Sequence, residues 1–361
     1  MYPLFRRMLF QLDPEAAHGL TLHSIGLAGR LAPTRWLLEG MFTTPEKPVE
    51  VLGLRFRNAV GLAAGYDKDG IAVPGLATLG FGHLEIGTVT PRPQEGNPKP
   101  RIFRLVEDDA VINRMGFPGS GMEAARRELT RVRQQQGGRS GTGPERTGTG
   151  PERTGTGNDI VIGVNLGKNK DTPLEAAAGD YLALLRTFIP LADYLAINIS
   201  SPNTVGLRRL QGREMLEELL GAIAVERNLV NRERGLWKPV LVKLAPDLSD
   251  DELEDALGVI LDKGMDGVIA TNTTLARQGL RSTLQGENGG LSGKPLGGRS
   301  KEILIKVVKF LDGKLPVISV GGIMNPQDAK RRLEMGAALV QVYTGLIYSG
   351  PGLVKEMVNR L

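Results

Sequence analysis

The sequence has no cysteine among its 361 residues, which removes several kinds of chemistry at once. Disulfide bonds, thiolate metal sites and cysteine nucleophiles are all excluded. Histidine is scarce as well, with only His18, His23 and His83 in the chain. A catalytic serine is normally activated by a histidine, and none of the three lies near the serines of INISSPNT (197–204). Any chemistry at this motif therefore lacks the usual histidine partner nearby in the sequence.

Long apolar runs are also missing. No run approaches the roughly 18 residues that are needed to cross a bilayer. The start of the chain, MYPLFRRMLFQLD, has only three apolar residues after its arginines, which is too few for a signal peptide. The formal net charge of +5 favours anionic ligands, but the basic residues are scattered and form no stripe. We therefore expect an intracellular protein that binds no nucleic acid.

The chain does contain a regular alternation of two kinds of segment. Amphipathic stretches with helix-forming residues separate the apolar runs, and Ser249 is a predicted helix N-cap before an acidic first turn. Near-continuous apolar strands between helices are typical of a parallel sheet with covered faces. Eight such units predict an α/β fold, a closed (β/α)8 TIM barrel over about 46–361. The predicted strands are 58–65, 83–89, 159–165, 194–200, 239–245, 267–272, 316–322 and 338–343.

The first 45 residues are predicted to form a separate helical pair. The segment PLFRRMLFQL gathers apolar residues on one helical face, and Asp13-Pro14 predicts the start of a second helix that runs to about Ala28. This pair could pack its apolar face on the barrel. It could equally lie on a membrane and admit an apolar ligand. The pattern leaves both interpretations open.

Two further segments interrupt the barrel pattern. VEVLGLRFRNAV (49–60) predicts a hairpin that closes the bottom of the barrel. The insertion at about 137–157 contains a duplicated GTGPERT heptad without an apolar residue. Such a segment cannot bury surface to offset the entropy of ordering, so we predict a mobile loop on the bottom face.

Polar residues stand at the ends of the predicted strands, where the active sites of such barrels lie. A single residue of this kind is usually a hydrogen-bonded core polar group or a cap, but a whole set indicates a site. Asparagine both donates and accepts hydrogen bonds and so can bind an amide or imide edge. The set comprises Lys68, Thr88, Asn165, Asn198, Ser201, Lys243, Thr271 and Asn272.

Glycine-rich turns end the last two strands, at VGGI (320–323) and YTG (343–345). The loops after strands 7 and 8 usually form the phosphate site of these barrels, with backbone N–H groups and a short helix as donors. Glycine allows the backbone to approach the anion closely. The sequence therefore predicts a phosphorylated ligand at this end of the barrel.

Long motifs of the chain resemble dihydroorotate dehydrogenase of the class 2, quinone-dependent type. The likeness covers nearly the whole chain except the insertion. It implies an FMN-containing barrel that oxidises dihydroorotate to orotate in pyrimidine biosynthesis, with a quinone as final electron acceptor. It also implies peripheral contact of the N-terminal helices with the inner, cytoplasmic face of the cell membrane. The motifs are AAGYDKDG (63–70), EIGTVTPRPQEGNPKPR (85–101), INRMGF (112–117), GVNLGKNK (163–170), INISSPNT, VKLAPDLS (242–249), ATNTT (270–274), GGLSGKPL (289–296) and VGGI.

The resemblance implies a role for each matching residue. Ser201 would be the base that removes the C5 proton, a position that class 1 relatives fill with cysteine. Lys68 would face the orotate carboxylate, and Lys243 would place a positive charge near the flavin ring. The other implied substrate contacts are Asn113, Arg114, Met115, Gly116, Phe117, Asn198, Asn203, Asn272 and Thr273. The implied FMN contacts are Ala64, Gly65, Tyr66, Asp67, Lys68, Thr88, Asn165, Asn198, Lys243, Thr271, Gly293, Gly321, Gly322, Tyr343 and Thr344.

Two other functions explain less of the sequence. A different FMN-dependent barrel oxidase that acts on 2-hydroxy acids would need a histidine base, which no motif supplies. A non-redox barrel that binds a phosphate would explain VGGI, but it would not explain Lys68, Lys243 and the asparagines together.

Overall fold

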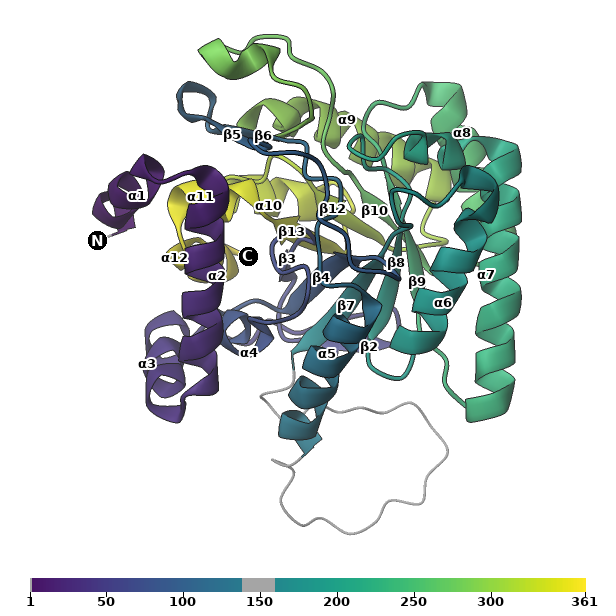
Figure 1. The fold of residues 1–361 in the computed structure, drawn as a ribbon, viewed down its shortest axis with the longest axis horizontal. Helices are drawn as coiled ribbons and strands as arrows, with labels where there is room; N and C mark the ends of the chain where they lie inside the picture. Colours follow the sequence, from purple (N-terminus) through teal and green to yellow (C-terminus); the bar gives the residue numbers. More distant parts are fainter. Residues whose placement is uncertain (1, 138–159) are drawn as a thin grey trace.

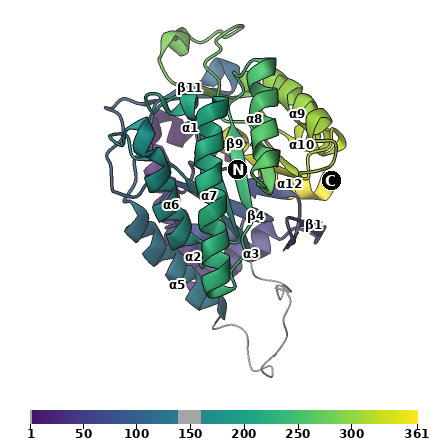
Figure 2. The same cartoon turned by 90° about the vertical axis from the view of Figure 1, so that its right-hand side faces the viewer.

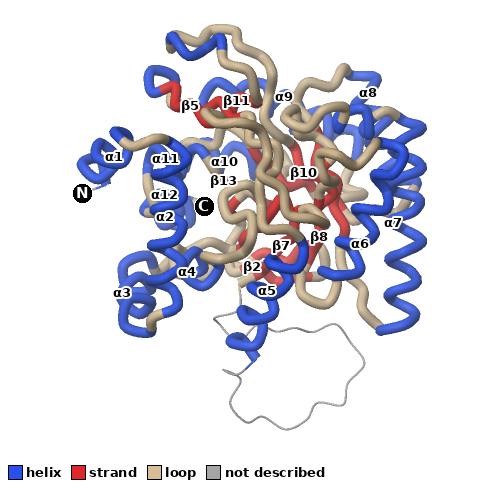
Figure 3. Tube along the Cα trace, viewed as in Figure 1, coloured by secondary structure: helices blue, strands red, loops and turns tan. Residues whose placement is uncertain are grey.

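The computed structural model describes residues 2–137 and 160–361, and these residues fold around a closed barrel of parallel strands (Figures 1 and 3). The strand order follows the chain, and the last strand pairs with the first. Each strand lies at a predicted position, so the predicted (β/α)8 barrel is confirmed. The eight strands are β3 (Val60–Leu62), β4 (His83–Val89), β7 (Val161–Leu166), β8 (Tyr194–Asn198), β9 (Val240–Leu244), β10 (Gly267–Ala270), β12 (Val317–Val320) and β13 (Leu339–Val342).

Helices cover the outside of the barrel, and α6, α7 and α8 form the side that faces the viewer in Figure 2. Ser249 caps its helix as predicted: its hydroxyl accepts the N–H of Glu252, whose carboxylate accepts the N–H of Ser249. The α-helices of the barrel are α4 (Val73–Ala77), α5 (Met122–Gly137), α6 (Ala177–Phe188), α7 (Arg213–Arg234), α8 (Asp250–Asp262), α9 (Gly297–Leu311), α10 (Pro326–Glu334), α11 (Thr344–Ser349) and α12 (Gly352–Arg360). Short 3₁₀ helices are η1 (Val106–Asp108), η2 (Leu174–Ala176), η3 (Leu207–Gln211), η4 (Thr283–Gly286) and η5 (Lys294–Leu296).

An antiparallel hairpin closes the bottom of the barrel, as predicted. Its strands β1 (Val49–Val51) and β2 (Leu54–Phe56) are joined at Leu52 and Gly53, which both have positive φ. Two positive φ values in a two-residue loop match the twist of a hairpin. Phe56 is fully buried and packs edge-to-face on His83 at the start of β4. Packed side chains therefore fill the barrel at the amino ends of its strands, so a site is expected at their carboxyl ends.

A small antiparallel sheet lies beyond the barrel strands, in the order β11-β6-β5. It consists of β5 (Ile102–Leu105), β6 (Ala110–Asn113) and β11 (Gly290–Gly293). The register places Asn113 opposite Gly290. The sheet therefore brings the segment after β4 to the segment after β10, at the end where the site is expected (Figure 3).

The N-terminal extension contains three helices, whereas the sequence predicted a pair. They are α1 (Tyr2–Gln11), α2 (Pro14–Arg30) and α3 (Ala32–Phe42), and Figure 1 shows them together on one side of the molecule. The predicted start of α2 is confirmed, since the carboxylate of Asp13 accepts the N–H groups of Glu15 and Ala16. The third helix begins with a proline in its first turn, where the missing N–H costs nothing.

Glycines allow α2 to lie directly against α4. Gly26 and Gly29 are buried on α2, and a Cβ on Gly29 would lie 2.1 Å from the backbone nitrogen of Gly75. Any larger side chain at position 29 would push the two helices apart. The extension is therefore held on the barrel by close backbone packing. The predicted insertion at 137–157 lies, apart from Gly137 at the end of α5, outside the described residues.

Candidate active site

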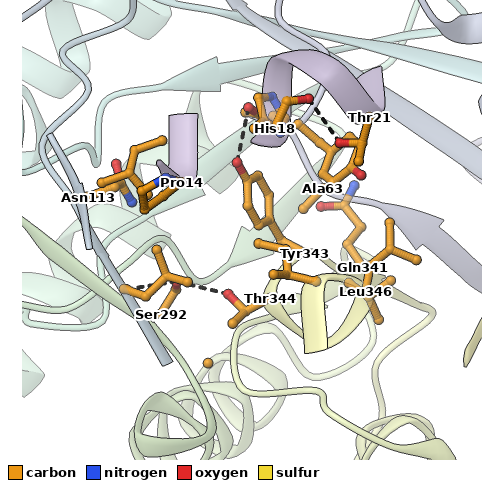
Figure 4. A pocket seen from close by; sticks show the side chains of 18 of the residues that line it. Pro14, His18, Thr21, Ala63, Asn113, Ser292, Gln341, Tyr343, Thr344 and Leu346 are labelled. Carbon is orange, nitrogen blue, oxygen red and sulfur yellow. Dashed lines mark hydrogen bonds between the residues drawn. The ribbon is translucent and has the colours of Figure 1, made fainter. Parts of the chain in front are cut away.

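A cavity of about 820 Å³ opens at the carboxyl ends of the barrel strands and continues between the barrel and the N-terminal helices. Its size is typical of a site for a cofactor or drug-sized ligand. Figure 4 shows Tyr343 projecting from the barrel towards His18 of α2. Most of the predicted site residues line this one cavity: Ala64, Gly65, Tyr66, Lys68, Thr88, Asn113, Met115, Gly116, Phe117, Asn198, Ser201, Asn203, Lys243, Thr271, Asn272, Thr273, Gly293, Gly321, Gly322, Tyr343 and Thr344.

Three predicted site residues lie outside the cavity wall. Asn165 stands immediately behind it and accepts hydrogen bonds from Thr88 and Asn198. Asp67 is buried with its carboxylate on the backbone N–H groups of residues 70, 71 and 72, and burial raises its pKa to about 6. Arg114 points away and pairs with Glu287 at 2.7 Å. The side chains of Asp67 and Arg114 thus support loops and do not face the ligand space.

A buried network of amides and hydroxyls forms the floor of the cavity. The Thr88 hydroxyl donates to Asn165 Oδ1 at 2.6 Å, and Asn198 Nδ2 donates to Thr88 Oγ1 at 2.9 Å. Asn272 Nδ2 donates to Ser200 Oγ at 3.0 Å. These residues come from β4, β7 and β8 and from the loops after β8 and β10, because neighbouring parallel strands end at the same edge. The network fixes amide groups whose remaining donors and acceptors can meet a ligand.

Glu85 lies beneath this floor and was not predicted from the sequence. Its carboxylate is fully buried and accepts hydrogen bonds from Asn165 Nδ2 at 2.8 Å, Tyr194 Oη at 3.0 Å and Gln341 Nε2 at 2.8 Å. Lys243 Nζ lies 3.6 Å from it. A buried carboxylate needs such partners. In HLEIGTV it reads as an ordinary strand residue, and only closure of the barrel reveals its inward position.

The two lysines of the site are held differently. Lys243 is buried and has Glu85 as a counter-charge. Lys68 is partly exposed to the cavity and donates to the carbonyl oxygen of Gly65 at 2.9 Å. Burial lowers the pKa of Lys68, and the neighbouring carboxylates of Asp69 and Asp67 oppose that shift. Both ammonium groups can meet an anionic or electron-rich ligand in the cavity.

Ser201 lies on the cavity wall and is 5% exposed. Its Oγ accepts the backbone N–H of Asn203 at 3.2 Å. The neighbouring Ser200 is fully buried outside the cavity and is hydrogen-bonded to Asn198 and Asn272. The hydroxyl of Thr204 is also buried and has no hydrogen-bond partner among the described residues. The two serines of the motif are therefore placed in different environments.

Glycines line the other end of the cavity. Gly293, Gly321 and Gly322 have φ of +95°, +106° and +69°, which side-chain-bearing residues rarely adopt. A Cβ on Gly322 would lie 2.3 Å from the Cα of Gly297 at the start of α9. The Thr344 hydroxyl donates to Ser292 Oγ at 2.9 Å on the same wall (Figure 4). This is the close backbone surface that a phosphate group needs.

The wall towards the N-terminal helices is aromatic. Tyr66 stacks edge-to-face with both His18 and Tyr343. Burial raises the pKa of Tyr66 to about 12 and lowers the pKa of His18 to about 4, with the charge of Lys68 adding to the latter shift. His18 is therefore neutral near pH 7. Sequence reasoning did not select His18, although it is one of only three histidines and lies on the helix that contacts the barrel.

A charged contact joins α2 to the loop before β5. Arg101 is buried and donates to Glu15 Oε1 at 2.6 Å and to Oε2 at 3.0 Å. It also donates to the backbone carbonyl of Asn97 at 2.8 Å, and the Asn97 side chain donates to the carbonyl of Asn203 in the serine motif. The N-terminal helices and the serine loop are thus connected through this arginine.

We expect Glu15→Gln to lower the stability of the protein by about 1 kcal/mol near pH 7. The hydrogen bonds from Arg101 hold the pKa of Glu15 below its ordinary value of 4.5. A lowered folded-state pKa stabilises the fold above pH 4.5, and the gain is lost as the pH falls through the folded-state value. Melting temperatures of parent and variant should therefore differ most above pH 4.5 and converge as the pH falls below the lowered pKa of Glu15. An equal difference at all pH values would show that the charge does not act.

Comparisons with known proteins identify the family of the chain. The family model described as dihydroorotate dehydrogenase matches residues 47–361. A dihydroorotate dehydrogenase (quinone) of Thiobacillus denitrificans is 46% identical over 362 aligned residues, which cover 100% of this chain and 99% of that protein. One of Akkermansia muciniphila is 44% identical over 100% of this chain and 97% of its own.

Solved structures give the same result. A crystal structure of DHODH from Eimeria tenella in complex with ferulenol has a TM-score of 0.82 and 38% identity, covering 96% of this chain and 90% of its own. A ligand-free form from the same organism has a TM-score of 0.79 and 39% identity, covering 92% and 93%. The resemblance drawn from the motifs is confirmed, and the chain belongs to the quinone-dependent class of the dihydroorotate dehydrogenase family.

Proposed function

We propose that this protein oxidises (S)-dihydroorotate to orotate with FMN as its bound flavin and a quinone as electron acceptor, in pyrimidine biosynthesis. The observation that carries the proposal is the single cavity that joins Ser201, Lys68 and the asparagine cluster to an apolar wall of N-terminal helices. The polar half suits a carboxylated cyclic imide, and the apolar half suits a quinone.

The residues present fit FMN. The positive-φ glycines 293, 321 and 322 form a backbone cradle that a phosphate can approach. Asn198, Thr88 and Lys243 on the floor would hold the flavin ring, with Asn165 supporting Thr88 and Asn198 from behind. FMN held there would supply a hydride acceptor for C6 of the substrate and a route for the electrons to the quinone.

Ser201 would remove the proton at C5 of the substrate. The adjacent carbonyl acidifies this proton, so the base needs no triad and no covalent intermediate. The N–H of Asn203 donates to Ser201 Oγ and would stabilise negative charge that develops there. The hydroxyl proton of Ser201 would pass on through Thr204, whose buried hydroxyl lacks a partner among the described residues, or through a water. Lys68 would bind the substrate carboxylate, with Asn113, Asn203, Asn272 and Thr273 around the ring.

The N-terminal helices would admit the quinone and contact the cytoplasmic face of the cell membrane peripherally. Within the described residues, no helix is long and apolar enough to cross a membrane. Phe10 of α1 packs edge-to-face on Tyr348 of α11, whereas Leu4, Phe5 and Met8 of the same helix are exposed. Phe5, Leu9 and His18 line the cavity. Helices that lie on a membrane surface and admit a quinone need exposed apolar side chains next to the cavity. The exposed large apolar side chains in this region are Leu4, Phe5, Met8, Leu12, Leu20, Leu27, Leu31, Trp36, Leu37 and Met41.

Release of the bound flavin tests the cofactor directly. The purified protein should be yellow, and heating it should release a flavin that co-migrates with FMN in chromatography. Without oxygen, the same protein should form more than one equivalent of orotate per flavin from dihydroorotate only when a quinone is added. Release of FAD or riboflavin, or a colourless and inactive protein, would contradict the proposal.

A further inference from the structure

Arg332 in the last turn of α10 is a buried cation, and no carboxylate among the described residues pairs with it. It is 1% exposed, and its guanidinium donates to the carbonyl oxygen of Gly321 at 2.9 Å and to Ser300 Oγ at 2.6 Å. It also donates to the carbonyl of Gly297 at 3.1 Å and to Ser319 Oγ at 3.3 Å. All these acceptors are neutral. In residues 2–137 and 160–361 no ion pair involves Arg332, and its Nε has no hydrogen-bond partner.

Such a charge is costly to bury. Removing an ion from water is strongly unfavourable unless a counter-charge or a full set of hydrogen bonds compensates it. Burial lowers the pKa of Arg332 to about 10, so the side chain remains charged near pH 7. Asp328 on the same helix attracts it only through space, since its carboxylate accepts the N–H of Met324. The part of the chain that the structure describes therefore gives this charge no close anionic partner.

The acceptors of Arg332 form the back of the glycine cradle. Gly321 follows β12, and Gly297 opens α9, where it touches Gly322. The carbonyl of Gly321 and the N–H of Gly322 belong to one planar peptide unit and point in opposite directions. With Arg332 on the carbonyl side, that N–H points away from the guanidinium, and Gly322 lines the cavity. A donor on the carbonyl polarises the peptide and makes its N–H a better donor for an anion.

We propose that Arg332 is a positioning residue for the phosphate of the flavin, and that its charge makes the site select a phosphorylated flavin over riboflavin. This inference rests on the proposed FMN function and deepens it. The phosphate supplies the anion that the buried guanidinium lacks. The guanidinium holds the two backbone segments of the cradle together from behind and adds positive potential to their N–H groups.

The test compares two flavins that differ only in the phosphate. Flavin is removed from the full chain, and the dissociation constants of FMN and riboflavin are measured by quenching of flavin fluorescence. In Arg332→Met we expect FMN to bind roughly 10–10²-fold more weakly, because the N–H groups of the cradle lose the positive charge that polarises them from behind. Riboflavin should bind as it does to the parent. Arg332→Lys, which keeps the charge, should retain most of the preference for FMN.

Two further variants serve as an alternative to Arg332→Met and as a control. Arg332→Gln retains donors for the cradle carbonyls but loses the charge, so it should show the same selective loss if Arg332→Met does not fold. Arg227→Met is the matched control, because Arg227 is also buried but pairs with Asp266. It should lower the melting temperature without changing the ratio of the two affinities.

Other results of these binding measurements would contradict the proposed role of Arg332. An equal loss of both flavins in Arg332→Met, or no loss of FMN affinity in the folded Arg332→Gln protein, would overturn the role of the charge. A parent that binds FMN no better than riboflavin would overturn it as well. A parent that binds neither flavin would contradict the proposed function itself, and the inference with it.

Discussion

Ser201→Ala should reduce its flavin about 10²–10⁴-fold more slowly than the parent when dihydroorotate is added, because a positioned base contributes that much to the rate. The variant should still bind FMN and orotate, since the cradle and the asparagines are unchanged. The measurement is stopped-flow bleaching of the flavin without oxygen. Bleaching at the parental rate would show that Ser201 is not the base.

Two neighbouring variants control this result. Ser200→Ala should be much milder, because Ser200 lies outside the cavity and only supports Asn198 and Asn272. Ser201→Cys should recover part of the rate with a shifted pH dependence, because a thiol is more acidic than a hydroxyl. A rate for Ser200→Ala as low as that of Ser201→Ala would mean that the loop, not one hydroxyl, is responsible.

Thr21→Trp should separate the two halves of the reaction. Thr21 lies on α2 and lines the cavity beside His18, so an indole there would fill the apolar part. We expect reoxidation of the reduced flavin by a quinone to slow about 10²-fold, the size of effect that misplacing a reactant by about 1 Å produces. Reduction by dihydroorotate should keep its parental rate. Double-mixing stopped flow measures both steps.

His23→Trp is the matched control for this variant. His23 lies on the same helix but is exposed and outside the cavity. It should leave both half-reactions unchanged. If Thr21→Trp slowed both halves equally, or neither, the quinone would not pass between α2 and the barrel.

Much of the barrel could be predicted because its strands are nearly continuous apolar runs and its helices are amphipathic. The hairpin at 49–60 was predictable for a similar reason, since glycine sits between alternating segments. The third N-terminal helix was missed because Pro33 and Gly40 make APTRWLLEGMF a weak helical pattern.

The site residues were predicted from motifs, which explains why most of them were found and why a few were missed or misplaced. Most of the site residues implied by the family resemblance line one cavity. Asp67 and Arg114 belong to the same motifs, but their side chains bind neighbouring loops and do not face the cavity. Glu85 and Arg332 were missed because a single charge in a strand or helix looks like a surface residue. Only the closed barrel shows that both are buried. The β11-β6-β5 sheet joins segments about 180 residues apart, which no local pattern reveals.

The most direct test of the central claim is an anaerobic titration of the purified, yellow protein. Adding one equivalent of dihydroorotate per flavin should bleach the flavin absorbance and yield one equivalent of orotate. A subsequent equivalent of quinone should restore the yellow spectrum. Failure of dihydroorotate to bleach the flavin would contradict the assigned reaction, and a bleached flavin that a quinone cannot reoxidise would contradict the assigned electron acceptor.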